Sequence, residues 1–188
     1  MTPSTNLRPA GHTCNRCMKK TPIRVFLSPF SYRHPLVQRM LQEFKYRRIR
    51  LLSPIMADLL VSYLNYYNIT LSEQMIIIPI PLHPRKERIR GFNQAALIAY
   101  DLNRHLSLTI DTQTLIRTAY NIPQTTLHAQ ERHANVQNIF SLRGNNNLRG
   151  KTILLLDDVK TTGATLEQAA RVLKKTGAKE IWAITFAH

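Results

Sequence analysis

The sequence predicts an α/β protein in which helices flank a parallel, twisted β-sheet, with a small irregular appendage at the N-terminus. Residues 75–82 form the most apolar stretch of the chain, and its length suits a strand buried on both faces of a parallel sheet. Near the C-terminus, an apolar run at 152–156 is followed by a helix-sized segment and a second apolar run at 180–187. This order predicts a right-handed strand–helix–strand unit, and such sheets bind ligands at the carboxyl ends of their strands.

Length and composition favour one main domain. With 188 residues, 44% of them hydrophobic and 20% charged, the chain can bury one substantial core. Residues 1–34 contain four prolines and little periodicity, so we assign them to an irregular or small β appendage and residues 35–188 to the main domain. No run of about 18 apolar residues is present, and residues 1–11 lack the apolar core of a secretory signal. We expect a cytoplasmic protein without membrane insertion.

Three helices are predicted in the first half of the main domain. Apolar residues recur at helical spacing between Pro35 and Phe44. Ser53 and Pro54 resemble the N-cap and first-turn proline of a second helix. Residues 81–91 are predicted to form a basic loop, and a third helix is expected from about 93 to 105.

The second half is predicted to contain further strands and a mobile loop. Residues 114–117 and 139–142 are strand candidates, and the polar stretch 118–135 between them has no strong period. After the strand at 152–156, Thr165 and Gln168 resemble a capping box that opens the last helix. Gly177 is suited to end that helix in the left-handed conformation.

The chain is strongly basic, because 26 Lys and Arg residues against 11 Asp and Glu residues give a formal charge of +15. Such a charge attracts polyanions, although a solvated basic face without a dedicated partner is the alternative. One compact basic segment includes an aromatic residue, a combination that suits single-stranded nucleic acid. Its candidate contacts are Lys45, Tyr46, Arg47, Arg48 and Arg50.

The only two cysteines, Cys14 and Cys17, form a single CxxC pair. A closed structural zinc site needs four ligands, and no second CxxC exists, so His12 and His34 are the residues that could complete a site. An ordinary surface dithiol is the alternative. A disulfide framework is not expected in a cytosolic chain.

Residues 153–165, which read ILLLDDVKTTGAT, combine two acids at the end of a strand with a hydroxyl-rich turn and a helix start. Backbone N–H groups at a helix start can bind phosphate, and Gly163 allows the backbone to approach closely. Asp157 and Asp158 can accept hydrogen bonds from sugar hydroxyls and help hold hydrated Mg²⁺. Alternatively, the acids cap a helix and the threonines reflect turn chemistry. The predicted phosphate-binding residues are Asp157, Asp158, Thr161, Thr162, Gly163, Ala164 and Thr165.

This pattern resembles the motif of type I phosphoribosyltransferases that binds 5-phosphoribosyl-1-pyrophosphate (PRPP). Over residues 36–187 the order of short motifs also resembles the ComF/GntX family. The matching motifs are Phe44-Lys45-Tyr46, residues 78–84 (IPIPLHP), residues 90–94 (RGFNQ), Arg117-Thr118, Gln124, Leu127, Arg132, Asn135-Val136 and Phe140. Members of this family usually carry an N-terminal zinc ribbon with two CxxC pairs, and this sequence has only the first.

The resemblance implies a type I phosphoribosyltransferase-like fold and a role in natural competence, in which imported single-stranded DNA is handled. It also implies that PRPP binds with Mg²⁺ and that the loop after the strand at 75–80 contacts pyrophosphate. The cations of that loop are Arg85, Lys86, Arg88 and Arg90. The segment with Arg117, Gln124 and Arg132 corresponds to a loop that closes over the reaction centre. The candidate catalytic residues are Arg132 of this loop and the acids Asp157 and Asp158.

Three functional hypotheses follow. The first is an enzyme that transfers the phosphoribosyl group of PRPP to a nitrogen nucleophile, although no residue of the sequence identifies the acceptor. The second is a non-catalytic competence factor that binds single-stranded DNA, with cytoplasmic proteins of DNA uptake or recombination as partners. The third is a regulator that senses PRPP without turnover.

Overall fold

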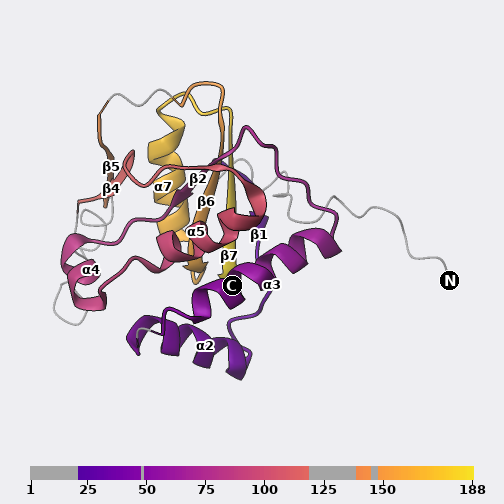
Figure 1. The fold of residues 1–188 in the computed structure, drawn as a ribbon. Coiled ribbons are helices and arrows are strands. Elements are labelled where there is room, and N and C mark those ends of the chain that lie inside the picture. The colour runs from indigo at the N-terminus through magenta and orange to yellow at the C-terminus, as the bar shows by residue number, and fades with distance from the viewer. Residues whose placement is uncertain (1–20, 48, 119–138, 145–147) are drawn as a thin grey trace.

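The computed structural model describes residues 21–47, 49–118, 139–144 and 148–188. Its main sheet has five parallel strands in the order β1-β7-β6-β2-β3, and the helices lie on both faces of this sheet (Figure 1). The bounds of these strands are Ile23–Leu27 for β1, Ile76–Pro79 for β2, Thr109–Ile110 for β3, Thr152–Val159 for β6 and Glu180–Ala187 for β7. The predicted fold class is confirmed.

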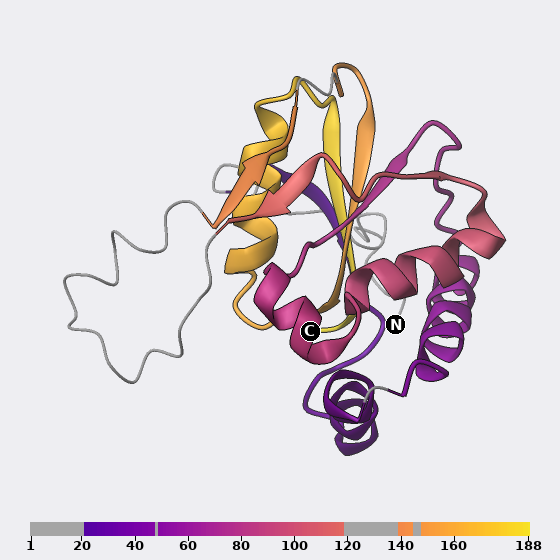
Figure 2. The same cartoon turned by 60° about the vertical axis from the view of Figure 1, so that its left-hand side comes forward.

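The helices divide between the two faces of the sheet. The helix α7 covers one face, and α2, α3 and α5 lie on the other (Figure 2). A short antiparallel pair, β4 (Leu115–Arg117) with β5 (Phe140–Leu142), packs on the α7 side. The helix bounds are Pro35–Tyr46 for α2, Leu52–Tyr66 for α3, Pro84–Arg90 for α4, Gln94–Leu106 for α5 and Ala164–Lys174 for α7.

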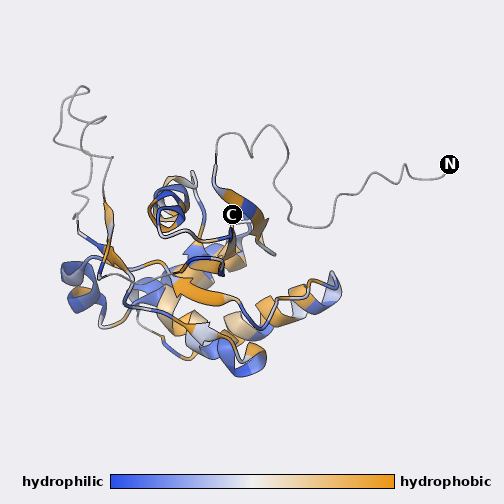
Figure 3. Ribbon diagram, turned by 90° about the horizontal axis from the view of Figure 1, so that it is seen from above, coloured by the Kyte–Doolittle hydropathy of each residue, from blue (hydrophilic) through white to orange (hydrophobic). Residues whose placement is uncertain are grey.

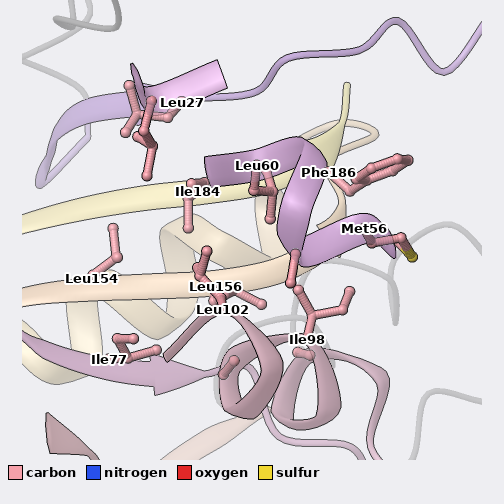
Figure 4. Packing of buried hydrophobic residues seen from close by; sticks show 14 of the residues in the cluster. Leu27, Met56, Leu60, Ile77, Ile98, Leu102, Leu154, Leu156, Ile184 and Phe186 are labelled. Carbon is pink, nitrogen blue, oxygen red and sulfur yellow. The ribbon is translucent and has the colours of Figure 1, made fainter. Parts of the chain in front are cut away.

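Strand β6 is apolar on both faces because each face packs against helices. Leu154 and Leu156 belong to the cluster formed with α3 and α5, whereas Ile153 and Leu155 face α7, as expected from the alternation of side chains along a strand. Figure 4 shows the first cluster, in which Leu60 of α3 and other labelled side chains meet the strands. The continuous apolar run of the sequence therefore reports a central strand.

Strand β1 differs from the prediction for the N-terminal region. Ile23–Leu27 pairs in parallel with β7 as an edge strand, and Val25 and Leu27 are buried in the main core. The segment from 21 to 34 is therefore packed on the domain to which residues 35–188 were assigned. The sequence suggested otherwise because Pro22 and Pro29 flank a strand of only five residues, and prolines are tolerated next to an edge strand. Residues 1–20 lie outside the described part.

The segment predicted as a basic loop at 81–91 contains the helix α4, and Figure 3 shows this helix in the blue of hydrophilic residues. His83 caps its start, because Nδ1 accepts a hydrogen bond of 3.2 Å from the N–H of Arg85. Pro84 occupies the first turn, and Gly91 ends the helix with a φ of +81°. The loop prediction was wrong because Pro84 and Gly91 were interpreted as turn residues, and not as the start and end of a short helix.

Two predicted helix starts were also wrong. Helix α3 begins at Leu52, so Ser53 lies within its first turn and is fully buried instead of serving as the N-cap. Helix α7 has Gly163 as its N-cap, with no capping side chain, so Thr165 does not form the predicted capping box. By contrast, the strands at 114–117 and 139–142 and the helix near 93–105 are confirmed. Among the described residues, no helix is long and apolar enough to cross a membrane.

Candidate functional site

Strand β6 extends through the acid pair and ends at Val159, so Asp157 and Asp158 belong to the strand and not to the following turn. Successive side chains of a strand point to opposite faces, which directs Asp158 to the face of Leu156 and Asp157 to the face of Leu155. The N–H of Asp158 donates a 2.8 Å hydrogen bond to Oδ1 of Asp157. The two carboxyl groups therefore lie on opposite faces of the sheet at the carboxyl end of β6, an edge that we call the rim.

Asp158 is paired with a lysine from a distant part of the sequence. Nζ of Lys45, at the end of α2, lies 2.8 Å from Oδ2 of Asp158, and the two side chains are only 18% and 8% exposed. Lys45 was predicted to contact nucleic acid. In the structure its ammonium lies at the sheet rim, because α2 packs on the face to which Asp158 points, and its contact with nucleic acid stays a prediction.

Asp157 has the most perturbed ionisation among the described residues. Burial and the neighbouring Asp158 carboxylate raise the pKa of Asp157 from 3.8 to about 8, although the N–H of Asp158 and the charges of Lys45 and Arg117 oppose the shift. Perturbed carboxyl groups of this kind concentrate at functional sites. The rim therefore has the electrostatic character expected of a binding or catalytic centre.

The turn that follows β6 presents backbone donors. No residue in the described part accepts a hydrogen bond from the N–H groups of Thr161, Thr162, Gly163 or Thr165, whereas the N–H of Ala164 reaches Oγ1 of Thr162 at 3.3 Å. Gly163 has a φ of +85°, and a Cβ atom there would lie 2.9 Å from Cε of Lys160. These amides lie at the N-terminus of α7, and backbone N–H groups at a helix start bind phosphate in many proteins.

The four predicted pyrophosphate contacts lie on two faces of helix α4, one partly buried and one exposed. Lys86 and Arg90 are partly buried, and Arg85 and Arg88 are exposed, as the spacing of one helical turn requires. Burial, together with the charges of Arg117 and Arg90, lowers the pKa of Lys86. Lys86, Arg90 and Arg117 therefore form a concentration of positive charge, which attracts anions.

Arg117 connects this cationic cluster with the acid pair. Burial lowers the pKa of its guanidinium, and the carboxylate of Asp157 opposes that shift. The guanidinium also lies over the ring of Phe140, 5.6 Å from its centroid, and Nε is buried without a hydrogen-bond partner in the described residues. Arg117 therefore lies close enough to influence both Lys86 and Asp157.

A cavity of about 560 Å³ lies between α4, α5 and β4. Arg117 is part of its wall, but Asp157 and Asp158 are not. Its amide side chains are engaged within the protein: Asn93 bonds Ile80 and the start of α5, and Gln113 accepts from Arg143 at 3.2 Å. The acid pair and the turn at 161–165 are therefore not part of the cavity lining, and Arg117 is the lining residue that lies near Asp157.

The basic segment at the end of α2 is largely engaged within the protein. Arg47 pairs with Glu43 at 3.2 Å, and Arg50 donates to the carbonyl oxygen of Gly91 at 3.0 Å. The ring of Tyr46 lies 5.7 Å from the guanidinium carbon of Arg90, although Tyr46 remains 72% exposed. Tyr46, Arg47 and Arg50 are nevertheless exposed, and contact of this segment with nucleic acid stays a prediction.

Several predicted site residues lie outside the described part of the chain. These are Cys14, Cys17, Arg48, Arg132 and the neighbours Gln124 and Leu127. In the ranges that the structure describes, no cluster of three or more His, Cys, Asp and Glu side chains is arranged to hold a metal ion. The zinc and closing-loop interpretations stay predictions.

Comparison with known proteins agrees with this architecture. A family model described as a phosphoribosyl transferase domain matches residues 92–188. Competence protein F of Haemophilus influenzae is 31% identical over 180 residues, which cover 89% of this chain and 75% of that protein. The chain belongs to the ComF family. The expected resemblance of the sequence to ComF proteins with a phosphoribosyltransferase domain is thereby confirmed.

Other relatives of this ComF protein include DNA utilization protein YhgH of Escherichia coli O157:H7, which is 30% identical over 183 residues, or 94% of this chain and 80% of that protein. Among solved structures, adenine phosphoribosyltransferase of Leishmania tarentolae is 16% identical, with a TM-score of 0.46, over 86% of this chain and 76% of that one.

Sequence reasoning missed two features of the ComF site. The contact between Lys45 and Asp158 joins helix α2 to strand β6, and no local pattern reports a contact over such a separation. The ammonium of Lys160 lies 4.3 Å from the centroid of Phe26, so this lysine of the turn packs against β1. Neither partner could be chosen before the sheet order was known.

Proposed function

We propose that this ComF protein binds PRPP or a related ribose phosphate at the carboxyl end of β6 and transfers the phosphoribosyl group. The observation that supports this most directly is the turn at Thr161–Gly163, whose N–H groups lack acceptors in the described structure and which follows the acid pair directly. The 5-phosphate would bind these amides, and the acids would accept hydrogen bonds from the ribose hydroxyls.

The cations around Lys86 would bind the pyrophosphate group. The charges of Arg117 and Arg90 disfavour the protonated form of Lys86, so an anion bound beside Lys86 would offset their repulsion. Mg²⁺ prefers oxygen ligands, and the carboxylates of the rim and the diphosphate offer them. When bound, Mg²⁺ would neutralise charge on the departing pyrophosphate.

In the proposed reaction, a nitrogen nucleophile forms a bond to C1 of the ribose as the bond from C1 to the pyrophosphate oxygen breaks. The bonding electron pair leaves with pyrophosphate, and the nitrogen loses its proton to water or a base. The protein contributes mainly positioning and electrostatic stabilisation. Asp157, Asp158 and, outside the described residues, Arg132 are the proposed catalytic residues.

Calorimetric titration of the protein with PRPP and Mg²⁺ tests the proposal without knowledge of the acceptor. We expect saturable binding, and loss of that binding in Asp158→Asn, with pyrophosphate release on addition of the correct nitrogen base. Absence of both binding and pyrophosphate release across a panel of bases would contradict the proposal. Binding without release for every acceptor would instead favour a PRPP-sensing regulator.

A second candidate function is the handling of single-stranded DNA in the cytoplasm, together with proteins of DNA uptake or recombination. Two observations favour it: the formal charge of +15, and relatives named competence protein F and DNA utilization protein. We expect salt-sensitive binding of single-stranded oligonucleotides in fluorescence anisotropy. Binding that does not weaken with salt, or no binding, would reject this candidate, and binding retained in Asp158→Asn would show that the two sites are separate.

A further inference from the structure

The ion pair between Lys45 and Asp158 joins two layers of the domain at the rim of the sheet. Their closest atoms, Nζ and Oδ2, are 2.8 Å apart, and both side chains are largely shielded from water. An ion pair in such a place is weak support for stability, since desolvation offsets most of the Coulomb attraction. A role in fixing geometry is the better explanation for a pair that sits beside the proposed ligand.

Lys45 is carried by a helix end that is firmly docked. Phe44 packs on Phe92 with ring centroids 5.5 Å apart, and Arg50, just after α2, lies over the same ring at 5.2 Å. Arg50 also donates to the carbonyl oxygen of Gly91. The end of α2 is therefore held against the turn between α4 and α5, which places the ammonium of Lys45 at a defined position.

The pair leaves one carboxylate oxygen of Asp158 available. Lys45 occupies Oδ2, and no residue of the described part donates to Oδ1. Without the ammonium, the carboxylate of Asp158 would lie buried beside that of Asp157 and would be free to rotate. The contact of the ammonium with Oδ2 restrains the orientation of the carboxylate, and with it the direction of Oδ1.

We propose that Lys45 is a positioning residue of the ribose-phosphate site, which holds Asp158 so that Oδ1 accepts a hydrogen bond from a ribose hydroxyl. This inference rests on the proposed function. It gives Lys45 a place on the sugar side of the site, acting through Asp158, and not a contact with DNA or with the pyrophosphate group. The end of α2 thereby contributes to the preference for a ribose ligand, because its Lys45 orients the carboxylate that binds the sugar.

The test compares Lys45→Met with Lys45→Arg and with Arg47→Met, a control from the same helix end whose side chain is 75% exposed. Binding of PRPP, ribose 5-phosphate and pyrophosphate, each with Mg²⁺, is measured by calorimetry at constant ionic strength. We expect Lys45→Met to weaken both ribose ligands by about tenfold or more, as displacement of a positioning group does, and to leave pyrophosphate binding unchanged. Lys45→Arg should restore most of the affinity, and Arg47→Met should bind like the wild type.

The double variant Lys45→Met/Asp158→Asn guards against misfolding, because it leaves no unpaired charge in the pair. If Lys45 acts through Asp158, its affinity for ribose 5-phosphate should equal that of Asp158→Asn alone. Additive losses, equal loss of pyrophosphate binding, or wild-type affinity in Lys45→Met would overturn the inference. Failure of the wild-type protein to bind either ribose ligand would be a different result, which refutes the proposed function itself.

Discussion

The N–H of Ile80 donates a 2.8 Å hydrogen bond to the carbonyl oxygen of Leu156, the residue before the acid pair. This bond extends the pairing of β2 with β6, in which Pro79 is the partner of Leu156, beyond the end of β2. The chain then enters α4, so the hydrogen-bond ladder between β2 and β6 sets the distance between the cations of α4 and the acids of β6. Parallel strands place their carboxyl ends at one edge, which is why these two segments meet.

Helix α4 allows a matched test of pyrophosphate recognition. Lys86→Ala should weaken pyrophosphate binding by about tenfold, the effect of removing one charge-assisted hydrogen bond of about 1.5 kcal/mol. Arg88→Ala removes the same charge from the exposed face of the helix and should change the affinity little. Calorimetric titration with pyrophosphate and Mg²⁺ measures both. Equal losses would mean that only net charge matters, and not the inner face of α4.

The pH dependence of folding should report Asp157. Its pKa is raised in the folded state to about 8, so this group favours folding fully below its unfolded value near 3.8 and loses that contribution as pH rises through 8. The ligand-free protein should therefore lose stability progressively between about pH 4 and pH 8, measured by thermal unfolding in the presence of a chelator.

Asp157→Asn provides the control for this dependence, because an amide stays neutral across that range. The difference in melting temperature between the variant and the wild type should increase in favour of the variant as pH rises. At pH 9 the increase should be at least about 2–4 °C, the shift expected for 1 kcal/mol in a chain of this size. Parallel curves for the two proteins would show that Asp157 is already ionised at neutral pH.

Gly163 should be intolerant of substitution for two separate reasons. Gly163→Ala meets strain from a φ of +85° and a close approach of the new Cβ to Lys160. Gly150→Ala has similar strain at a φ of +74°, but no described atom within 4 Å. In urea unfolding we expect a loss of about 1–2 kcal/mol for each variant, because the flexible side chain of Lys160 can move away from the new Cβ. PRPP binding should weaken only in Gly163→Ala, and an equal loss of PRPP binding in Gly150→Ala would contradict this account.

Asn93 and Asn103 separate stability from site geometry. Asn93 caps α5 and donates to the carbonyl oxygen of Ile80 at 3.0 Å, whereas Asn103 bonds both backbone groups of Leu108. Each change to alanine should cost about 1–2 kcal/mol in urea unfolding. Only Asn93→Ala should also weaken pyrophosphate binding, since only Asn93 holds the segment that leads into α4. Unchanged binding in that variant would show that the ladder alone fixes the segment.

Local sequence patterns were sufficient to predict an element where burial of apolar side chains or the chemistry of a turn decides its conformation. The apolar runs at 75–80, 152–156 and 180–187 predict strands because a central parallel strand is buried on both faces. The order of acids, threonines and glycine at 157–165 predicted the strand, turn and helix that the structure contains. Patterns failed where packing decides: the short strand β1 and the first turn of α3 depend on neighbours that lie far away in the sequence.

The sequence by itself determined the fold class, the family, and the segment that carries the acids and the amide-rich turn, because these depend on burial and on residues adjacent in the chain. Only the tertiary structure decided that Lys45 meets Asp158, that Lys86 and Arg90 face inward while Arg88 does not, and that Arg117 lies near Asp157. The physical reason is that ion pairs and pKa shifts depend on distance and burial in space, which the order of strands sets and no local pattern encodes.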